Sequence, residues 1–279
     1  MFKDSLQLLA LNLLPQHLVS RAAGKFASSP LSKSLIPVLV KRFDIDVTQA
    51  EKPVESYETL NDFFTRRLKP GLRPIGGGAR DVVSPVDGKV SAAGKISSGR
   101  LWQVKGVTYS LSDLLNGDRE MVERFTDGEF ITIYLSPQDY HRIHMPIGGR
   151  LVAASYVPGS LFPVNPFAVR HVTNLFARNE RLITYAETQA GLMALLKVGA
   201  TMVGSVKVVY GDMTTNVGGK RETRKLTPSP RLAKGDELGR FEFGSTVVVL
   251  FEKGRVKLRK FAADEKLLLG QVIGQVAAR

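Results

Sequence analysis

The stretch Phe130-Ile131-Thr132-Ile133-Tyr134-Leu135 consists of β-branched, aromatic and aliphatic residues, which is typical of a buried β-strand. Val247-Val248-Val249-Leu250-Phe251 is more hydrophobic still and leads directly into the turn sequence Glu252-Lys253-Gly254. Three further runs of this kind lie between the two, at 182–185, 192–198 and 202–210. Because helical periodicity is sparse after residue 80, these runs predict a β-rich body.

The first 43 residues have a different pattern, which is helical, apolar and cationic. Phe2, Leu6, Leu9 and Leu13 recur at helical spacing until Pro15 ends the pattern. A second apolar run at 35–40 is expected to be interrupted by Pro37 and is ended by Lys41-Arg42. Short apolar helices flanked by cations suit the surface of an anionic bilayer. The alternative is a helical cap packed on the core, and different faces of one helix can serve both purposes.

Composition narrows the class of protein. A chain of 279 residues with 43% hydrophobic and 23% charged residues is globular, not disordered, collagen-like or coiled coil. The absence of cysteine excludes a disulfide framework, a thiolate metal site and a cysteine nucleophile. The apolar run at 6–14 is shorter than the roughly 20 residues of a spanning helix, and no signal cleavage site follows it. We therefore predict an α+β fold, with a helical membrane-associating segment at 1–60 and a β-rich domain at 61–279.

The net charge of +13 predicts an anionic partner, either an acidic membrane surface or nucleic acid. The sequence contains neither a basic sheet interleaved with aromatic residues nor a recognisable reading helix, which disfavours a non-enzymatic module that binds nucleic acid.

Histidine chemistry has few candidates, because the chain contains only four histidines. Two of them, His141 and His144, lie just past a predicted strand. Histidines three residues apart share one face of a helix and can bind a metal, but no carboxylate ligand motif adjoins this pair. We therefore predict no metal site and favour a catalytic or structural role.

Two other short motifs carry possible chemistry. Asp87 lies in the turn Ser84-Pro85-Val86-Asp87-Gly88 between apolar strands. An Asp-Gly pair at such a place can serve only to form the turn. Gly244-Ser245-Thr246 stands at the start of the most hydrophobic strand, where the glycine lets a nucleophile approach its carbonyl closely. A serine hydrolase using Asp87, His144 and Ser245 is one interpretation. However, Val247 replaces the second glycine of a hydrolase elbow, and a strand follows instead of a helix.

In this order, Asp87, His144 and Gly244-Ser245-Thr246 resemble the phosphatidylserine decarboxylases, pyruvoyl-dependent enzymes that make phosphatidylethanolamine. Matching blocks also occur at 61–71, 140–146, 157–159 and 174–181, so the likeness extends from about residue 60 to the end. Several blocks in one order are more specific than Gly-Ser-Thr alone. Phe243 stands where the bacterial family usually has leucine, a change that affects only local packing and cleavage rate.

The resemblance implies a proenzyme that cuts its own Gly244–Ser245 bond. Ser245 would attack the Gly244 carbonyl, with His144 as general base and Asp87 orienting the imidazole. Ser245 would become a pyruvoyl group, leaving a β chain of residues 1–244 and an α chain of residues 245–279, in a family that is usually dimeric. The pyruvoyl carbonyl would form a Schiff base with phosphatidylserine and accept the electron pair freed by loss of carbon dioxide. His144 would then return a proton to the α carbon.

The resemblance also implies where the protein acts. Phosphatidylserine is an anionic lipid, so the basic excess fits an anionic phospholipid membrane, peripheral attachment to the cytoplasmic face of the cell membrane, and no nucleic acid. His141 is a candidate contact for the substrate phosphate or carboxylate, and Arg66, Arg67, Lys69 and Arg73 are candidate lipid contacts. The turn at 84–88 resembles those of lipoyl-carrier-type sheets, which implies a body of the barrel-sandwich type.

Overall fold

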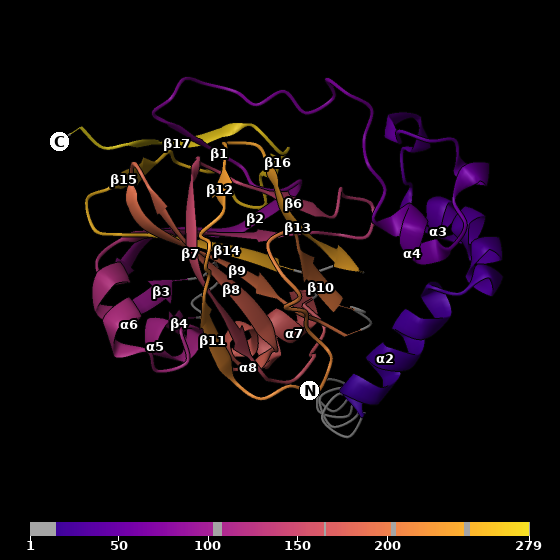
Figure 1. Ribbon diagram of the computed structural model, residues 1–279, viewed down its shortest axis with the longest axis horizontal. Helices are drawn as coiled ribbons and strands as arrows, with labels where there is room; N and C mark the ends of the chain where they lie inside the picture. The colour runs from indigo at the N-terminus through magenta and orange to yellow at the C-terminus, as the bar shows by residue number, and fades with distance from the viewer. Residues whose placement is uncertain (1–14, 103–107, 165, 202–204, 243–245, 279) are drawn as a thin grey trace.

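The structure is a computed structural model, and it describes residues 15–102, 108–164, 166–201, 205–242 and 246–278. The predicted α+β class is confirmed, with helices at the start of the chain and strands after residue 80. Figure 1 shows these first helices on one side of the β-rich body. They are α2 (Gln16–Ala27), η1 (Pro30–Leu35), α3 (Ile36–Phe43), η2 (Val47–Gln49), η3 (Val54–Ser56) and α4 (Leu60–Phe64). The helical pattern predicted at 2–13 lies outside the described residues.

Pro37 was expected to interrupt the second apolar run, but it lies in the first turn of α3. A proline there costs little, because the first N–H groups of a helix have no intrahelical acceptor. α3 ends at Asp44, whose φ of 51° is left-handed and stops the helical path. In the described residues, no helix is both long enough and apolar enough to cross a bilayer.

The N-terminal helices enclose a small apolar cluster of their own. Its buried members are Ala27, Ile36, Ile45, Tyr57, Leu60 and Phe63. The rings of Tyr57 and Phe63 meet edge to face, with centroids 5.4 Å apart. One face of these helices is therefore packed within the N-terminal segment itself. Their outer face exposes Leu18, Leu31 and Val38 at 67%, 78% and 61%.

The β-rich body contains one large antiparallel sheet and two small ones in the described residues. The large sheet has the order β11-β7-β8-β9-β14-β5-β2-β3-β4, with β12 beside β7 and β16 beside β2. The small sheets are β1-β17-β15 and β10-β13-β6. The strands are β1 (Asp81–Val83), β2 (Gly88–Ser97), β3 (Arg100–Trp102), β4 (Thr108–Ser110), β5 (Glu129–Tyr134), β6 (Arg142–His144), β7 (Gly149–Val157), β8 (Arg181–Thr188), β9 (Gly191–Val198), β10 (Ser205–Val208), β11 (Glu222–Lys225), β12 (Arg231–Leu232), β13 (Glu237–Glu242), β14 (Thr246–Phe251), β15 (Val256–Leu258), β16 (Lys266–Leu267) and β17 (Val272–Val276).

Both faces of the large sheet are covered, which explains the continuous hydrophobic runs in its central strands. Val247, Val249 and Phe251 of β14 pack into one core. Val248 and Leu250 pack into a second core on the opposite face. The second core is closed by short helices, α5 (Leu111–Leu114), α6 (Arg119–Phe125), α7 (Pro166–His171) and α8 (Leu175–Arg178).

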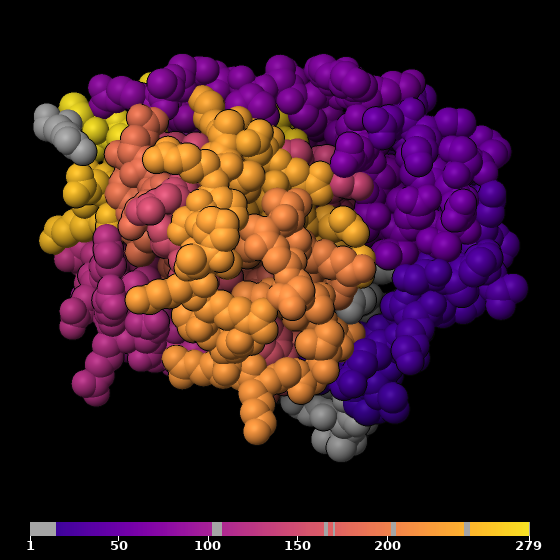
Figure 2. All heavy atoms as spheres, in the orientation of Figure 1, coloured from indigo at the N-terminus to yellow at the C-terminus, as the bar shows by residue number. Residues whose placement is uncertain are grey.

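The segment 218–234 contains six cations, two prolines and two glycines, a composition that predicts an exposed loop, and that prediction is wrong in part. Residues Glu222–Lys225 form β11 and Arg231–Leu232 form β12, both paired with β7. All four residues of β11 are exposed, so this edge strand has no apolar alternation for sequence analysis to detect. In Figure 2 this part of the chain covers the near face of the body in orange.

Candidate active site

Three strands bring the predicted catalytic segments to one edge of the large sheet. Tyr134 ends β5 and pairs with Lys89 of β2 on one side and with Thr246 of β14 on the other. All three strands are antiparallel neighbours, so β2 and β14 both begin where β5 ends. Asp87 directly precedes β2, and the segment 135–141 directly follows β5. The site therefore lies at this edge.

The predicted cleavage residues Gly244 and Ser245 lie outside the described residues. The nearest described residues on either side of them are Glu242, which ends β13, and Thr246, which begins β14. Thr246 is completely buried at the edge that carries Asp87. The tight fit there depends on Gly88, where a Cβ atom would lie 2.4 Å from the carbonyl oxygen of Tyr134.

Asp87 is held by an arginine from a distant part of the chain. Arg73 Nη2 lies 2.6 Å from Asp87 Oδ2, and Arg73 Nε lies 2.9 Å from Oδ1. The backbone N–H of Leu269 also donates to Oδ1, at 2.7 Å. These charge-assisted bonds fix a carboxylate that is only 3% exposed. Arg73 belongs to the long segment between α4 and β1 that crosses over the body in Figure 1.

His144 is oriented by a backbone carbonyl. Its Nδ1 lies 2.8 Å from the oxygen of Gly235, and its Nε2 lies 3.2 Å from the hydroxyl of Tyr140. A carbonyl only accepts, so Nδ1 carries the proton and the Nε2 lone pair accepts from Tyr140. Burial lowers the pKa of His144, and the bond to Gly235 opposes that shift only in part. The imidazole is therefore neutral near pH 7, with the unprotonated Nε2 that a general base needs.

Asp87 was expected to orient the imidazole of His144, and the hydrogen bonds differ from that expectation. Both side chains lie in one site, since the backbone N–H of His144 donates to the carbonyl of Pro85, two residues before Asp87, at 2.8 Å. However, Asp87 binds Arg73, and the Gly235 carbonyl takes the orienting position. Sequence analysis had no signal for this acceptor, because every residue has a backbone carbonyl.

His141 is completely buried, and its contact with substrate stays a prediction. Its Nδ1 donates to the carbonyl of Asp139 at 2.8 Å, and its ring lies 4.0 Å from that of Phe64. Burial lowers the pKa of His141 to about 3, so the ring is neutral. The interpretation in which His141 and His144 share one face of a helix is wrong, because His144 lies in strand β6. Within the described ranges, no group of three or more His, Cys, Asp or Glu side chains is suited to a metal.

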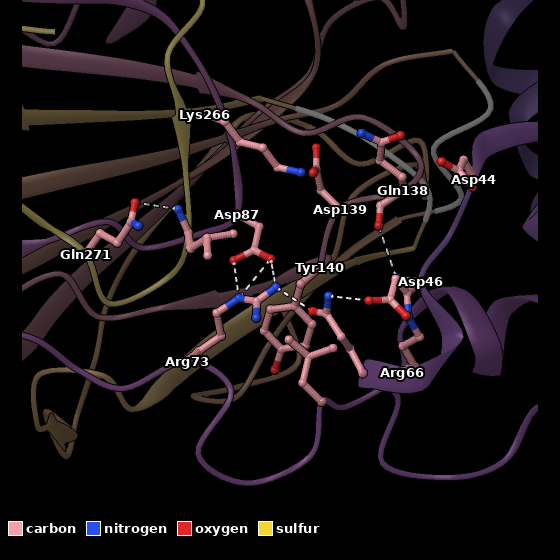
Figure 3. Close-up of a pocket in the computed structure, with 13 residues that line it drawn as sticks. Asp44, Asp46, Arg66, Arg73, Asp87, Gln138, Asp139, Tyr140, Lys266 and Gln271 are labelled. Carbon is pink, nitrogen blue, oxygen red and sulfur yellow. Dashed lines mark hydrogen bonds and ion pairs between the residues drawn. The ribbon is translucent and has the colours of Figure 1, made fainter.

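A pocket of about 530 Å³ opens beside Asp87 and Tyr140. In Figure 3 Arg73 faces Asp87 on its floor, and Lys266 extends across it toward Asp139. Its lining comes from five separate parts of the chain: Asp44, Asp46, Gln49, Arg66, Leu68, Arg73, Asp87, Gln138, Asp139, Tyr140, Lys266, Leu268 and Gln271. A cavity of this size suits a small polar headgroup. Lys266 and Gln49 line this pocket but were not predicted from the sequence, because neither lies in a motif.

Comparison with known proteins agrees with the resemblance. Residues 60–275 match the family described as phosphatidylserine decarboxylase. A protein of Brevibacillus brevis is 50% identical over 263 residues, which cover 93% of this chain and 94% of the relative. A Myxococcus xanthus protein is 42% identical over 271 residues, covering 95% and 96%. A Shewanella protein is 47% identical over 262 residues, covering 91% and 90%. All three are named phosphatidylserine decarboxylase proenzyme.

Proposed function

The chain belongs to the phosphatidylserine decarboxylase family, and from this premise we propose that it converts phosphatidylserine to phosphatidylethanolamine and carbon dioxide after cutting itself. The observation that carries the proposal is the family match over residues 60–275, which includes Asp87, His144 and Ser245. The convergence of β2, β5 and β14 at one edge supports it.

The proposed cut separates residues 1–244 from residues 245–279. His144 Nε2 removes the hydroxyl proton of Ser245 while the oxygen attacks the carbonyl carbon of Gly244. The amide becomes an ester, and β-elimination then releases the carboxylate of Gly244 and leaves a dehydroalanine. Hydrolysis of that group yields the pyruvoyl group and ammonia. Asp87, held by Arg73 and by the N–H of Leu269, would fix the start of β2 at the edge of the sheet where β14 begins.

One buried hydroxyl at the site can donate to a small keto group. Thr246 Oγ1 is buried and lacks a hydrogen-bond partner among the described residues, so a keto oxygen bound by it would relieve that cost. His141 Nε2 is also buried and without a partner there, but it carries a lone pair and can only accept, because the proton of this neutral ring is on Nδ1. The pyruvoyl group would supply the electron sink that decarboxylation requires. His144 would take up a proton from water at Nε2 and return it to the α carbon, which leaves the imidazole neutral again.

A denaturing intact-mass spectrum tests this proposal first. Two chains that separate after Gly244 are expected, and the α chain should be lighter by one ammonia than a peptide beginning with serine. A single chain that decarboxylates phosphatidylserine would contradict the mechanism. A single chain whose Ser245 reacts with a fluorophosphonate would favour the serine hydrolase interpretation instead.

The pH dependence of self-cleavage follows from the pKa of His144. Only the neutral imidazole accepts a proton, and burial lowers its pKa below the usual 6.5. The cleavage rate at pH 6.5 should therefore be more than half of the rate at about pH 8, and the half-maximal rate should be reached only in more acidic buffer. The measurement is a time course of α-chain appearance from freshly synthesised proenzyme. A rate that is already halved at pH 6.5 would contradict this assignment.

The N-terminal segment 1–60 is proposed to attach the enzyme peripherally to the anionic cytoplasmic face of the cell membrane. Its described part exposes Leu18, Leu31 and Val38 on the outer face of the helical cap. Five cations accompany them, namely Arg21, Lys25, Lys33, Lys41 and Arg42. Figure 2 shows this segment forming one whole side of the molecule. Apolar insertion and attraction to anionic lipid would act together there.

The double variant Leu31→Asp, Val38→Asp is expected to bind vesicles containing phosphatidylserine about 30-fold more weakly or worse, because two apolar insertions are lost. Vesicle sedimentation measures this, and intact mass shows that self-cleavage is unchanged. Val209→Asp is a matched control, because this valine is 52% exposed outside the N-terminal segment. Equal loss of binding in the control would contradict the proposed surface.

Two finer features are proposed on the resemblance alone. Two αβ units are expected to associate as a dimer, which sedimentation equilibrium of the processed protein would measure. The β-rich body is expected to be of the barrel-sandwich type, and the Ser84–Gly88 turn between β1 and β2 supports this expectation.

A further inference from the structure

Arg66 is a buried cation with unused hydrogen-bond donors. It follows α4 and is only 4% exposed. Its Nη2 donates to the carbonyl of Gln138 at 3.2 Å, and its guanidinium carbon lies 5.1 Å from the ring centre of Phe63. Nε and Nη1 have no acceptor among the described residues. Burying such donors without an acceptor is costly, so the arrangement indicates that a ligand supplies one.

The acidic groups near Arg66 are occupied by other partners. Asp87 binds Arg73, Asp46 accepts from Thr48 and Gln49, and Asp139 accepts from Ser136. No ion pair of Arg66 with an acidic side chain is found in the described part of the chain. An arginine keeps its charge even when it is buried, so the positive charge of Arg66 is available to an anion.

The location of Arg66 relates this charge to the reaction. Arg66 lines the same pocket as Asp87 and Tyr140, and Tyr140 contacts the imidazole of His144. A small shift of the guanidinium would exchange its single bond to Gln138 for two charge-assisted bonds to an anion in this pocket.

We propose that Arg66 binds the phosphodiester of the phospholipid substrate, an inference that rests on the proposed function. The substrate also carries a carboxylate, but decarboxylation removes that negative charge. A cation on the carboxylate would therefore stabilise the bound substrate more than the transition state and would slow the reaction. The phosphodiester charge does not change during the reaction. A cation bound to the phosphodiester therefore stabilises the bound substrate and the transition state equally.

Arg66→Gln is therefore expected to raise KM for phosphatidylserine in mixed micelles about 10-fold to 100-fold and to leave kcat unchanged. Arg66→Lys should raise KM less, because an ammonium group keeps the charge but cannot make the paired bonds. Arg119→Gln is the matched control, since Arg119 is exposed in α6 and does not line the pocket. Self-cleavage, followed by intact mass, should proceed normally in all three variants.

Glycerophosphocholine tests the anion site separately, because it carries the phosphodiester but no primary amine. It should inhibit the unaltered enzyme competitively. Its inhibition constant should be higher for Arg66→Gln by the same factor by which KM rises. An unchanged KM in Arg66→Gln, or a loss confined to kcat, would overturn the inference. Failure of both Arg66 variants to fold or cleave would assign the guanidinium a structural role and also overturn it.

If the unaltered protein does not decarboxylate phosphatidylserine, the proposed function fails. Calorimetric titration with glycerophosphocholine would then decide the anion site by itself. Binding that Arg66→Gln weakens supports the site, and binding that is absent or equal in both proteins overturns it.

Discussion

Ser245→Ala is expected to abolish both self-cleavage and decarboxylase activity. The variant lacks the hydroxyl that attacks Gly244, and without an oxygen on Cβ it also has no leaving group whose elimination could produce the dehydroalanine that becomes the pyruvoyl group. Removing a catalytic nucleophile typically costs a factor of about a million in rate, so no cleavage should be detected. Intact mass should show one chain of full length, and carbon dioxide release from phosphatidylserine should equal background.

Ser245→Thr is the informative companion variant, because it keeps a hydroxyl at the same position. It should cleave slowly, since the added methyl group restricts the side chain. Normal cleavage of Ser245→Ala would exclude Ser245 as the nucleophile. Cleavage at a different bond in either variant would exclude Gly244–Ser245 as the natural site.

His144→Ala is expected to slow self-cleavage by about 100-fold to 10,000-fold, which is the usual contribution of a general base. The hydroxyl of Ser245 would then lack the neutral Nε2 that removes its proton. Accumulation of uncleaved chain, measured by intact mass over time, reports the rate. Added imidazole should restore part of it if the loss is one of chemistry and not of folding.

His171→Ala provides the matched histidine control. His171 is exposed in α7, and its Nδ1 donates only to the carbonyl of Phe167, within the same helix. Its removal should leave self-cleavage unchanged. Normal processing of His144→Ala would refute the assignment of His144 as the base, and equal slowing in both variants would point to a general effect of removing a histidine.

The sequence predicted the central strands well because their signal is local. β5 and β14 are buried on both faces, so nearly every residue in them is apolar and the pattern can be read without knowing their neighbours. Exposed β11 has no such pattern, and only its pairing with β7 makes it a strand. Pro37 shows the opposite case, in which a residue that usually breaks helices lies where it helps to start one.

Asp87, His144 and Ser245 lie in motifs that can be quoted from the chain, so the side chains available for chemistry and their order follow from the amino-acid sequence alone. Their partners depend on the tertiary fold. It brings Arg73 to Asp87 and the carbonyl of Gly235 to His144, and it places Arg66 in the pocket beside Tyr140. Apolar burial leaves a periodic pattern in the chain. Hydrogen bonds between distant segments leave none, least of all when the acceptor is a backbone carbonyl.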